Sequence, residues 1–224
     1  MIRFFDILFC LMAVTLLIPI LLLVSILLKF TAEGEVIYSQ KRVGVDGISF
    51  SLLKFATMLK NSENIGTGSI TIKNDPRVLP LGKFLRKTKL NELPQLFNVI
   101  KGDMGIIGPR PLTRVNFNYY DNETRSIISK IKPGLSGIGS IYFRNEEDYL
   151  TTSEDPEEIY KNIIAPYKGK LEIWYSENVN LKNYLLAIFA TIIAIIFNNQ
   201  NIIFKIFPNL PIPNDDLTFT EKDE

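Results

Sequence analysis

One uncharged apolar run, from Ile7 to Leu28, constrains the fold of this chain more than any other feature. It matches the roughly 20 apolar residues that a helix needs to cross a hydrocarbon core of about 30 Å. A secretory signal peptide has a shorter apolar core and a small-residue cleavage site, and this run has neither. A buried helix of a soluble protein rarely shows such uniform apolarity. We therefore predict a membrane helix over residues 1–30.

Pro19 lies near the middle of this run and predicts a kink, because proline cannot donate a backbone hydrogen bond to the carbonyl of Thr15. Positive residues flank the run on both sides, with Arg3 before it and Lys29 after it. Positive flanks favour the cytoplasmic side of a membrane. A helix that bends at Pro19 and leaves the membrane on the side where it entered satisfies both observations. A straight spanning helix is the alternative.

The composition excludes several classes of function. The formal net charge is +1, whereas nucleic-acid-binding domains are usually strongly basic, so we predict no nucleic-acid partner. The chain has no histidine, which removes the commonest general base and metal ligand. Its single cysteine, Cys10, excludes an internal disulfide and makes a thiolate zinc site implausible. A metal in this protein is therefore expected to be a hard, oxygen-bound ion such as Mg²⁺.

Residues after the apolar run are predicted to form a helix-rich α/β domain. Partial alternation over 35–55 indicates two short strands around a turn at 44–47, as a small antiparallel element. Helical patterns follow over 81–100 and 116–131, and the glycine-punctuated segment 135–143 indicates a strand or a tight backbone segment near a ligand.

Other segments are predicted from composition. Residues 61–68 are polar and glycine-rich, which favours a mobile loop. Acidic residues gather between 146 and 158, which is typical of a solvated face. The apolar segment 181–207 is expected to be helical and membrane-associated, because its first half is too short to span a membrane alone. The tail 208–224 is expected to be disordered.

Basic residues precede a carboxylate in the stretch from Arg86 to Met104. Lys87 and Lys89 follow Arg86, and Glu92 comes next, within an apolar run. A second rigid turn, Gly108-Pro-Arg-Pro111, adds another arginine. Phosphate-binding cations beside a partly desolvated carboxylate are parts that a phosphoryl-transfer site needs. On spacing alone, a solvated charged helix followed by a loop explains the same pattern.

The order of short motifs along the chain resembles that of the bacterial sugar transferases, also called monotopic phosphoglycosyl transferases or polyprenyl-phosphate glycosylphosphotransferases. The resemblance covers roughly residues 1–180, and so many ordered matches make it highly specific. The matching motifs are Lys54-Phe55, Asn74-Asp-Pro-Arg77, Gly82-Lys-Phe-Leu-Arg-Lys87, Asn91-Glu-Leu-Pro-Gln95, Asn98-Val, Gly102-Asp-Met104, Gly108-Pro-Arg-Pro111 and Lys132-Pro-Gly134.

This resemblance implies a reaction and a location. Such enzymes transfer a sugar-1-phosphate from a UDP-sugar to undecaprenyl phosphate, need Mg²⁺ and release UMP. Their product is a lipid-linked diphosphosugar for capsule, O-antigen or glycoprotein glycan synthesis. They lie at the cytoplasmic face of the bacterial inner membrane through a re-entrant, proline-kinked helix, and relatives can form homodimers. The resemblance thus implies re-entry at Pro19 and a cytoplasmic catalytic domain over residues 31–180, in the minimal catalytic form of the family.

Asn91 departs from the family pattern at the position that matters most for catalysis. The family usually has Asp-Glu where this chain has Asn91-Glu92, and that aspartate is understood as the covalent nucleophile, while the glutamate helps bind Mg²⁺ or handles a proton. An amide is uncharged and a poor nucleophile. Three interpretations stay open: Glu92 attacks phosphorus itself or acts as the base for direct attack by the polyprenyl phosphate; Asn91 is an engineered substitution that traps an inactive enzyme; or the chain is a pseudoenzyme that only binds lipid or nucleotide.

Two further departures concern charge. Ala56 replaces an arginine that the family commonly has, and Glu172 replaces an aspartate. Glu172 is a second candidate metal ligand beside Glu92, or it pairs with Lys170.

The candidate phosphate-binding set is cationic, because arginine suits bidentate phosphate contacts. Each of its cations is alternatively a structural ion pair. Two prolines hold Arg110 in a rigid loop, which lowers the entropy lost on binding. The predicted substrate-binding residues are Lys54, Arg77, Arg86, Pro109, Arg110 and Pro111.

Overall fold

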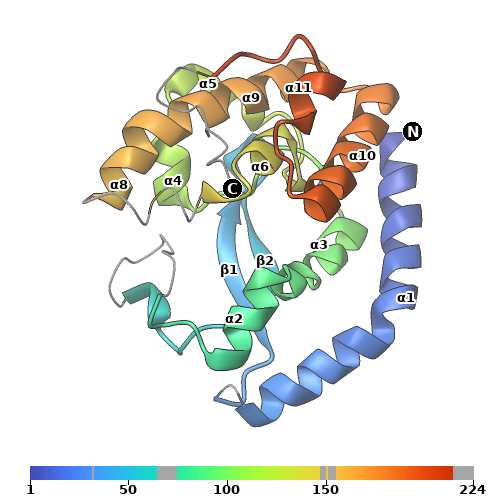
Figure 1. Cartoon of the computed structure of the whole chain (residues 1–224), viewed down its shortest axis with the longest axis vertical. Coiled ribbons are helices and arrows are strands. Elements are labelled where there is room, and N and C mark those ends of the chain that lie inside the picture. The colour runs from blue at the N-terminus through green and yellow to red at the C-terminus, as the bar shows by residue number, and fades with distance from the viewer. Residues whose placement is uncertain (32, 65–74, 147–149, 151–154, 214–224) are drawn as a thin grey trace.

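The computed structural model describes residues 1–31, 33–64, 75–146, 150 and 155–213. Over these residues the chain is helix-rich with two small sheets, as the predicted fold class requires (Figure 1). The elements are α1 (Ile2–Thr31), β1 (Ile37–Val43), η1 (Val45–Gly47), β2 (Ser49–Phe55), η2 (Ser62–Asn64), α2 (Pro80–Lys87), η3 (Leu90–Glu92), α3 (Gln95–Lys101), β3 (Gly105–Ile107), α4 (Arg114–Asn118), α5 (Asn122–Ile128), β4 (Gly134–Ser136), α6 (Ile138–Tyr142), α8 (Pro156–Ile159), the π-helix η4 (Tyr160–Ile164), α9 (Ala165–Glu177), α10 (Leu181–Phe197) and α11 (Ile202–Ile206).

Strands β1 and β2 form the predicted antiparallel pair, with Tyr38 opposite Lys54. The connection between them contains Asp46 and Gly47, both with positive φ, a conformation that glycine adopts at little cost. The amide of Val43 at the end of β1 donates to the carbonyl of Leu112 at 2.9 Å. This bond ties the hairpin to the chain just after the turn that carries Arg110.

A second, parallel pair of strands supports that turn from below. The amide of Gly108 after β3 donates to Ser136 of β4, and the amide of Gly134 donates to the carbonyl of Pro109, both at 2.9 Å. A Cβ atom on Gly134 would lie 2.1 Å from the nitrogen of Gly108, so the close approach requires glycine. Within the predicted segment 135–143, Gly137 makes a similar approach, since a Cβ atom there would lie 2.2 Å from the carbonyl oxygen of Gly108, but most of the segment is helix α6.

Helix α1 runs along one side of the domain and is bent part-way along its length (Figure 1). The Arg3 guanidinium donates to the carbonyls of Val99 at 2.5 Å and Ile100 at 2.7 Å, where a cation stabilises the C-terminal end of α3. By length and composition alone, α1 is the one helix of the described chain that could cross a membrane. Large apolar side chains stay exposed along it, at Phe4, Leu11, Met12, Leu16, Leu22, Leu23, Ile26 and Phe30.

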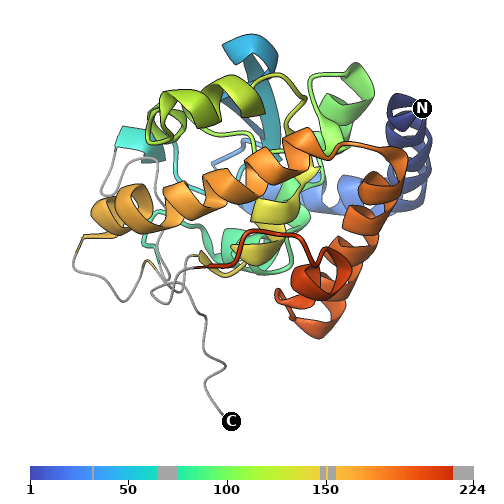
Figure 2. The same ribbon diagram turned by 90° about the horizontal axis from the view of Figure 1, so that it is seen from above.

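Helix α10 lies beside the N-terminal half of α1 in both views (Figures 1 and 2). The two helices are joined by Asp6, a buried carboxylate that accepts from the Tyr184 hydroxyl at 3.0 Å and from the Ile106 amide at 2.9 Å. Apolar side chains of α10 are also exposed, including Phe189, Ile196 and Phe197.

We expect Asp6→Ala to destabilise the fold, because it leaves the Ile106 amide and the Tyr184 hydroxyl without an acceptor. Each buried donor left unpaired costs about 1–3 kcal/mol. Denaturant unfolding of the detergent-solubilised protein measures the loss. Tyr184→Phe removes only one of the two bonds and should lose less. An Asp6→Ala variant as stable as the parent would contradict this role.

Two predictions differ from the structure at the level of single segments. The predicted helix 116–131 is two helices, α4 and α5, because Asp121 caps a new helix by accepting from the Thr124 amide at 2.7 Å. The tail does not become disordered at 208: Leu210 is buried, and the carbonyl of Pro211 accepts from the Tyr167 hydroxyl at 2.8 Å. Residues 214–224 and the predicted loop residues 65–68 lie outside the described chain.

Candidate active site

An open cavity of about 1120 Å³ is lined by the β1–β2 hairpin, α2, η3 and the turn that carries Arg110. Its charged lining is mostly positive, which favours phosphate-bearing ligands. Among the described residues, the basic ones that line it are Arg42, Lys54, Lys60, Lys83, Arg86, Lys87, Lys89, Arg110 and Arg144. The acidic ones are Glu35, Asp75, Glu92 and Glu146.

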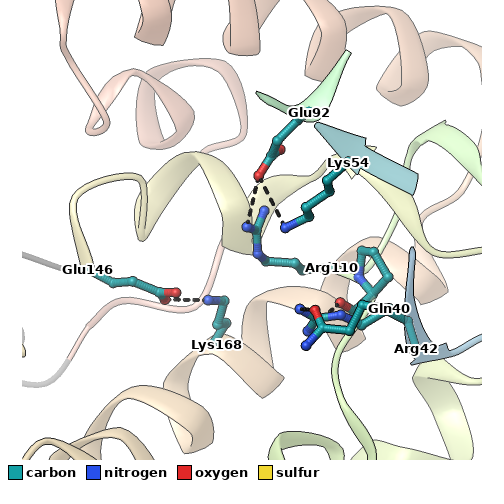
Figure 3. A network of polar contacts seen from close by, with 8 residues as sticks. Gln40, Arg42, Lys54, Glu92, Arg110, Glu146 and Lys168 are labelled. Carbon is teal, nitrogen blue, oxygen red and sulfur yellow. Dashed lines mark hydrogen bonds and ion pairs between the residues drawn. The ribbon is translucent and has the colours of Figure 1, made fainter. Parts of the chain in front are cut away.

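Glu92 joins two cations of the cavity, Arg110 and Lys54 (Figure 3). Its Oε1 is 3.4 Å from Nη2 of Arg110 and 3.8 Å from Nζ of Lys54, and its side chain is 16% exposed. Burial alone would raise its pKa, but Arg110 and Lys54 outweigh that effect and hold the pKa at about 2. Glu92 is therefore an anion at every physiological pH. It holds two cations in place and is a poor general base.

Lys54 is a strongly perturbed cation of the cavity. Burial lowers its pKa to about 7; Glu92 counteracts this, while the nearby guanidinium groups of Arg42 and Arg110 lower it further. Lysine titrates near 10.4 when unperturbed. A lysine of this kind gains a proton when an anion arrives, because the anion stabilises the charged form.

We expect the affinity for UDP to fall as the pH rises above about 7. Below that pH Lys54 is already protonated; above it, binding must take up a proton, which weakens binding by up to about tenfold per pH unit. Titration calorimetry at pH 6–9 in buffers of different ionisation enthalpy measures both affinity and proton uptake. Lys54→Met should abolish the pH dependence, and the exposed Lys101→Met should leave it intact. A pH-independent affinity in the parent would contradict the role of Lys54.

Arg110 is positioned by the backbone of its own turn. The prolines on both sides restrict it, as predicted, and the β3–β4 pair fixes the base of the turn. From below, its backbone amide donates to Oε1 of Glu172 at 3.4 Å. The guanidinium group is thereby held toward Glu92 in the cavity.

Arg42 is a cation that was not predicted as part of this site. It hydrogen-bonds to Gln40 and donates to the carbonyl of Pro111 at 3.4 Å (Figure 3). Burial and the neighbouring Arg110 lower its pKa to about 10, so it stays charged at neutral pH. The period of two along a strand could have revealed it, because Tyr38, Gln40 and Arg42 share one face of β1.

An ion pair adjoins the cavity through Glu146, which lines it. Nζ of Lys168, which is 1% exposed, lies 2.5 Å from Oε2 of Glu146 (Figure 3). Lys168 also faces the rings of Phe143 and Tyr160 at 5.3 and 5.9 Å. Glu146 therefore belongs to the site. The prediction that it lies on a solvated face is wrong, whereas Glu157 and Glu158 are exposed as predicted. Sequence offered no signal for the pairing across 22 residues.

Glu172 lies one helical turn after Lys168 on α9 and beneath the Arg110 turn. It is 1% exposed and outside the cavity lining, and burial raises its pKa to about 7. Its second oxygen has no hydrogen-bond partner among the described residues. The structure therefore does not bring Glu172 together with Glu92 in the cavity. Nor does any group of three acidic side chains gather as a metal site within the described chain.

The remaining predicted residues differ in their placement. Arg86 lines the cavity from the end of α2. Arg77 does not: its guanidinium forms a bidentate pair with Asp75 at 2.6–3.1 Å and donates to Ser62 at 2.8 Å. Asn91 does line the cavity, in η3 beside Glu92.

A sequence model of one family, bacterial sugar transferase, matches residues 1–198. The chain belongs to this family. It is 32% identical over 207 residues to the exopolysaccharide production protein ExoY of Sinorhizobium fredii, with 86% of this chain and 84% of the relative covered. It is 33% identical over 204 residues to the undecaprenyl-phosphate galactose phosphotransferase of Salmonella typhimurium. This match covers 84% of this sugar transferase but only 39% of the relative.

A third relative matches this sugar transferase over a shorter stretch. The putative undecaprenyl-phosphate N-acetylgalactosaminyl 1-phosphate transferase of Bacillus subtilis is 40% identical over 132 residues, which are 59% of this chain and 73% of the relative. The match to the family spans the cavity, the Arg110 turn and α10.

Proposed function

We propose that this chain is a phosphoglycosyl transferase that moves a sugar-1-phosphate from a UDP-sugar to undecaprenyl phosphate and releases UMP. The observation that carries the proposal is Glu92 held between Lys54 and Arg110 in a cavity whose described lining includes nine basic side chains. Fixed cations of this kind neutralise phosphate charge during transfer. Membership of the sugar transferase family supports it, as do relatives named undecaprenyl-phosphate galactose and N-acetylgalactosaminyl transferases.

Glu92 is the residue that would hold Mg²⁺. Magnesium is usually bound through one or two carboxylates together with substrate phosphates rather than by an all-protein cage, and Glu92 is a carboxylate in a cavity whose charged lining is mostly cationic and suits phosphate. When bound, the ion would neutralise diphosphate charge. Since Glu172 lies outside the cavity, we limit the metal role to Glu92 and assign Glu172 to the support of the Arg110 turn.

The membrane arrangement follows from α1 and α10. Pro19 lies inside α1, which is bent (Figure 1), and proline removes a helix hydrogen bond. We attribute the bend to Pro19 and propose that α1 re-enters the cytoplasmic face of the bacterial inner membrane. The exposed apolar side chains of α1 and α10 would contact lipid, and residues 31–180 would face the cytoplasm with the cavity near the phosphate of the lipid substrate.

A pseudoenzyme is the second candidate, because Asn91 stands where the family usually has the nucleophile. Such a protein would bind UDP or lipid phosphate in the same cavity and release no UMP. The two candidates therefore differ in a single readout.

UMP release from a panel of UDP-sugars, with undecaprenyl phosphate and Mg²⁺ in nanodiscs, tests the proposal. We expect release that depends on both the lipid phosphate and one UDP-sugar. UDP binding without release from any sugar in the panel, together with turnover by Asn91→Asp, would support the pseudoenzyme. Absence of both binding and release would overturn both candidates.

A further inference from the structure

The chemistry available at position 91 differs from that of a covalent catalyst. Asn91 is 6% exposed, and its buried Oδ1 has no hydrogen-bond partner among the described residues. Asn91 lines the cavity and immediately precedes Glu92 in the sequence. A neutral amide at this place can accept or donate a hydrogen bond to a substrate, but it does not attack phosphorus as a carboxylate does.

No other carboxylate of the described cavity lining is without a cation. A carboxylate engaged by a cation directs charge and lone pairs to that partner. The nitrogen–oxygen distances between each carboxylate and its cation are 3.5 Å for Glu35–Lys60, 2.6 Å for Asp75–Arg77, 3.4 Å for Glu92–Arg110 and 2.5 Å for Glu146–Lys168. Glu92 is also 3.8 Å from Lys54. Each carboxylate of the described lining thus already has a cation partner, and the residue at position 91 is a neutral amide.

The overall reaction does not require a nucleophile or a base from the protein. A terminal oxygen of the lipid phosphate forms a bond to the sugar-bearing phosphorus of the UDP-sugar, and the bond from that phosphorus to the bridging oxygen of UMP breaks. The lipid phosphate and UDP-sugar enter as dianions, and the lipid diphosphosugar and UMP leave as dianions, so no proton is transferred. What the step needs is neutralisation of charge between two anions and their alignment.

The cavity is built for that task. Its volume of about 1120 Å³ exceeds the range of about 300–1,000 Å³ that is usual for one small ligand. The ionised carboxylate of Glu92 holds Lys54 and Arg110 in place without consuming a proton, and Arg42, held by Gln40 and the Pro111 carbonyl, adds a third cation to the lining. A neutral residue at position 91 also avoids placing a second negative charge against an incoming phosphate.

We propose that this chain transfers the sugar phosphate in one direct displacement, with the UDP-sugar and the polyprenyl phosphate bound together, and forms no covalent enzyme intermediate. The inference rests on the proposed transferase function. Its products are the same, but its kinetics are sequential rather than ping-pong.

Isotope exchange with the full-length chain in nanodiscs tests this directly. Labelled UMP is incubated with the UDP-sugar and Mg²⁺ without lipid acceptor. A covalent intermediate would return label to the UDP-sugar, whereas direct displacement gives exchange below about 1% of the turnover rate. Initial rates at several concentrations of both substrates should give intersecting rather than parallel reciprocal plots.

Asn91→Asp calibrates the assay, because it restores a carboxylate at the empty position and should gain exchange without acceptor. A relative with Asp-Glu at this position serves for the same calibration if the variant does not fold. Exchange by the parent without acceptor at a rate close to turnover, or a sugar-phosphate adduct in its intact mass, would overturn direct displacement and leave the transferase standing. Lack of UMP release even with acceptor would overturn both.

Discussion

Arg110→Met is expected to lower kcat/KM for the UDP-sugar by a factor of about 10²–10³, the loss usual for removal of one preorganised charge donor. Arg110 is held by its turn, by the two neighbouring prolines and by the amide contact to Glu172. A cation fixed in this way needs little reorganisation when negative charge develops on the transferred phosphate. The variant also removes the closest partner of Glu92, so both kcat and KM should change. Steady-state kinetics in nanodiscs measure them.

Arg110→Lys separates charge from geometry. Lysine keeps the positive charge but cannot form the planar bidentate contacts of arginine, so we expect recovery of only part of the loss. Arg125→Met on α5 is the matched control, because Arg125 donates to the exposed side chains of Asn118 and Asn122 and does not line the cavity. If Arg110→Met stayed within twofold of the parent, the turn would not contribute to transfer.

Local sequence patterns predicted the parts of the fold that depend on local interactions. The β1–β2 hairpin follows from alternation around a glycine turn, and α1 follows from one long apolar run. The two prolines beside Arg110, preceded by Gly108, indicated a rigid turn, and in the structure this turn passes β4 at backbone contact distance. The stretch from Arg86 to Glu92 indicated a phosphate site, and both of these side chains line the cavity.

Long-range contacts could not be predicted, because nothing local specifies them. Lys168 is a single charged residue in a helix, and its pairing with Glu146 depends on how α9 packs against α6. Arg77 was predicted to bind phosphate because it is an arginine in a matching motif, yet its guanidinium group forms an ion pair with Asp75, only two residues earlier. Glu172 was assigned to metal from its charge, and only the packing beneath Arg110 shows that it lies outside the cavity.

Glu92→Gln is expected to reduce kcat by at least about 10³ while leaving the protein folded, because the substitution keeps the side-chain size and removes one charge at a site of developing charge. Arg110 would lose its anchoring charge. Lys54 would lose the one nearby anion that keeps its pKa as high as about 7, so at neutral pH most of it would be uncharged. Turnover and denaturant unfolding of the same preparations separate a chemical loss from a structural one, and Glu123→Gln, exposed on α5, is the control.

The pH profile distinguishes this explanation from loss of a general base. If Glu92 were a general base with a pKa of about 2, the parent's rate would rise as the pH increases through 2. The activity lost in Glu92→Gln would then not return at lower pH. In the charge network, Glu92→Gln lowers the pKa of Lys54 further, so the residual activity should move to lower pH, where Lys54 regains its proton. Residual activity that is independent of pH between 5 and 8, or that exceeds about a tenth of the parent's rate, would show that Glu92 does not hold these cations for transfer.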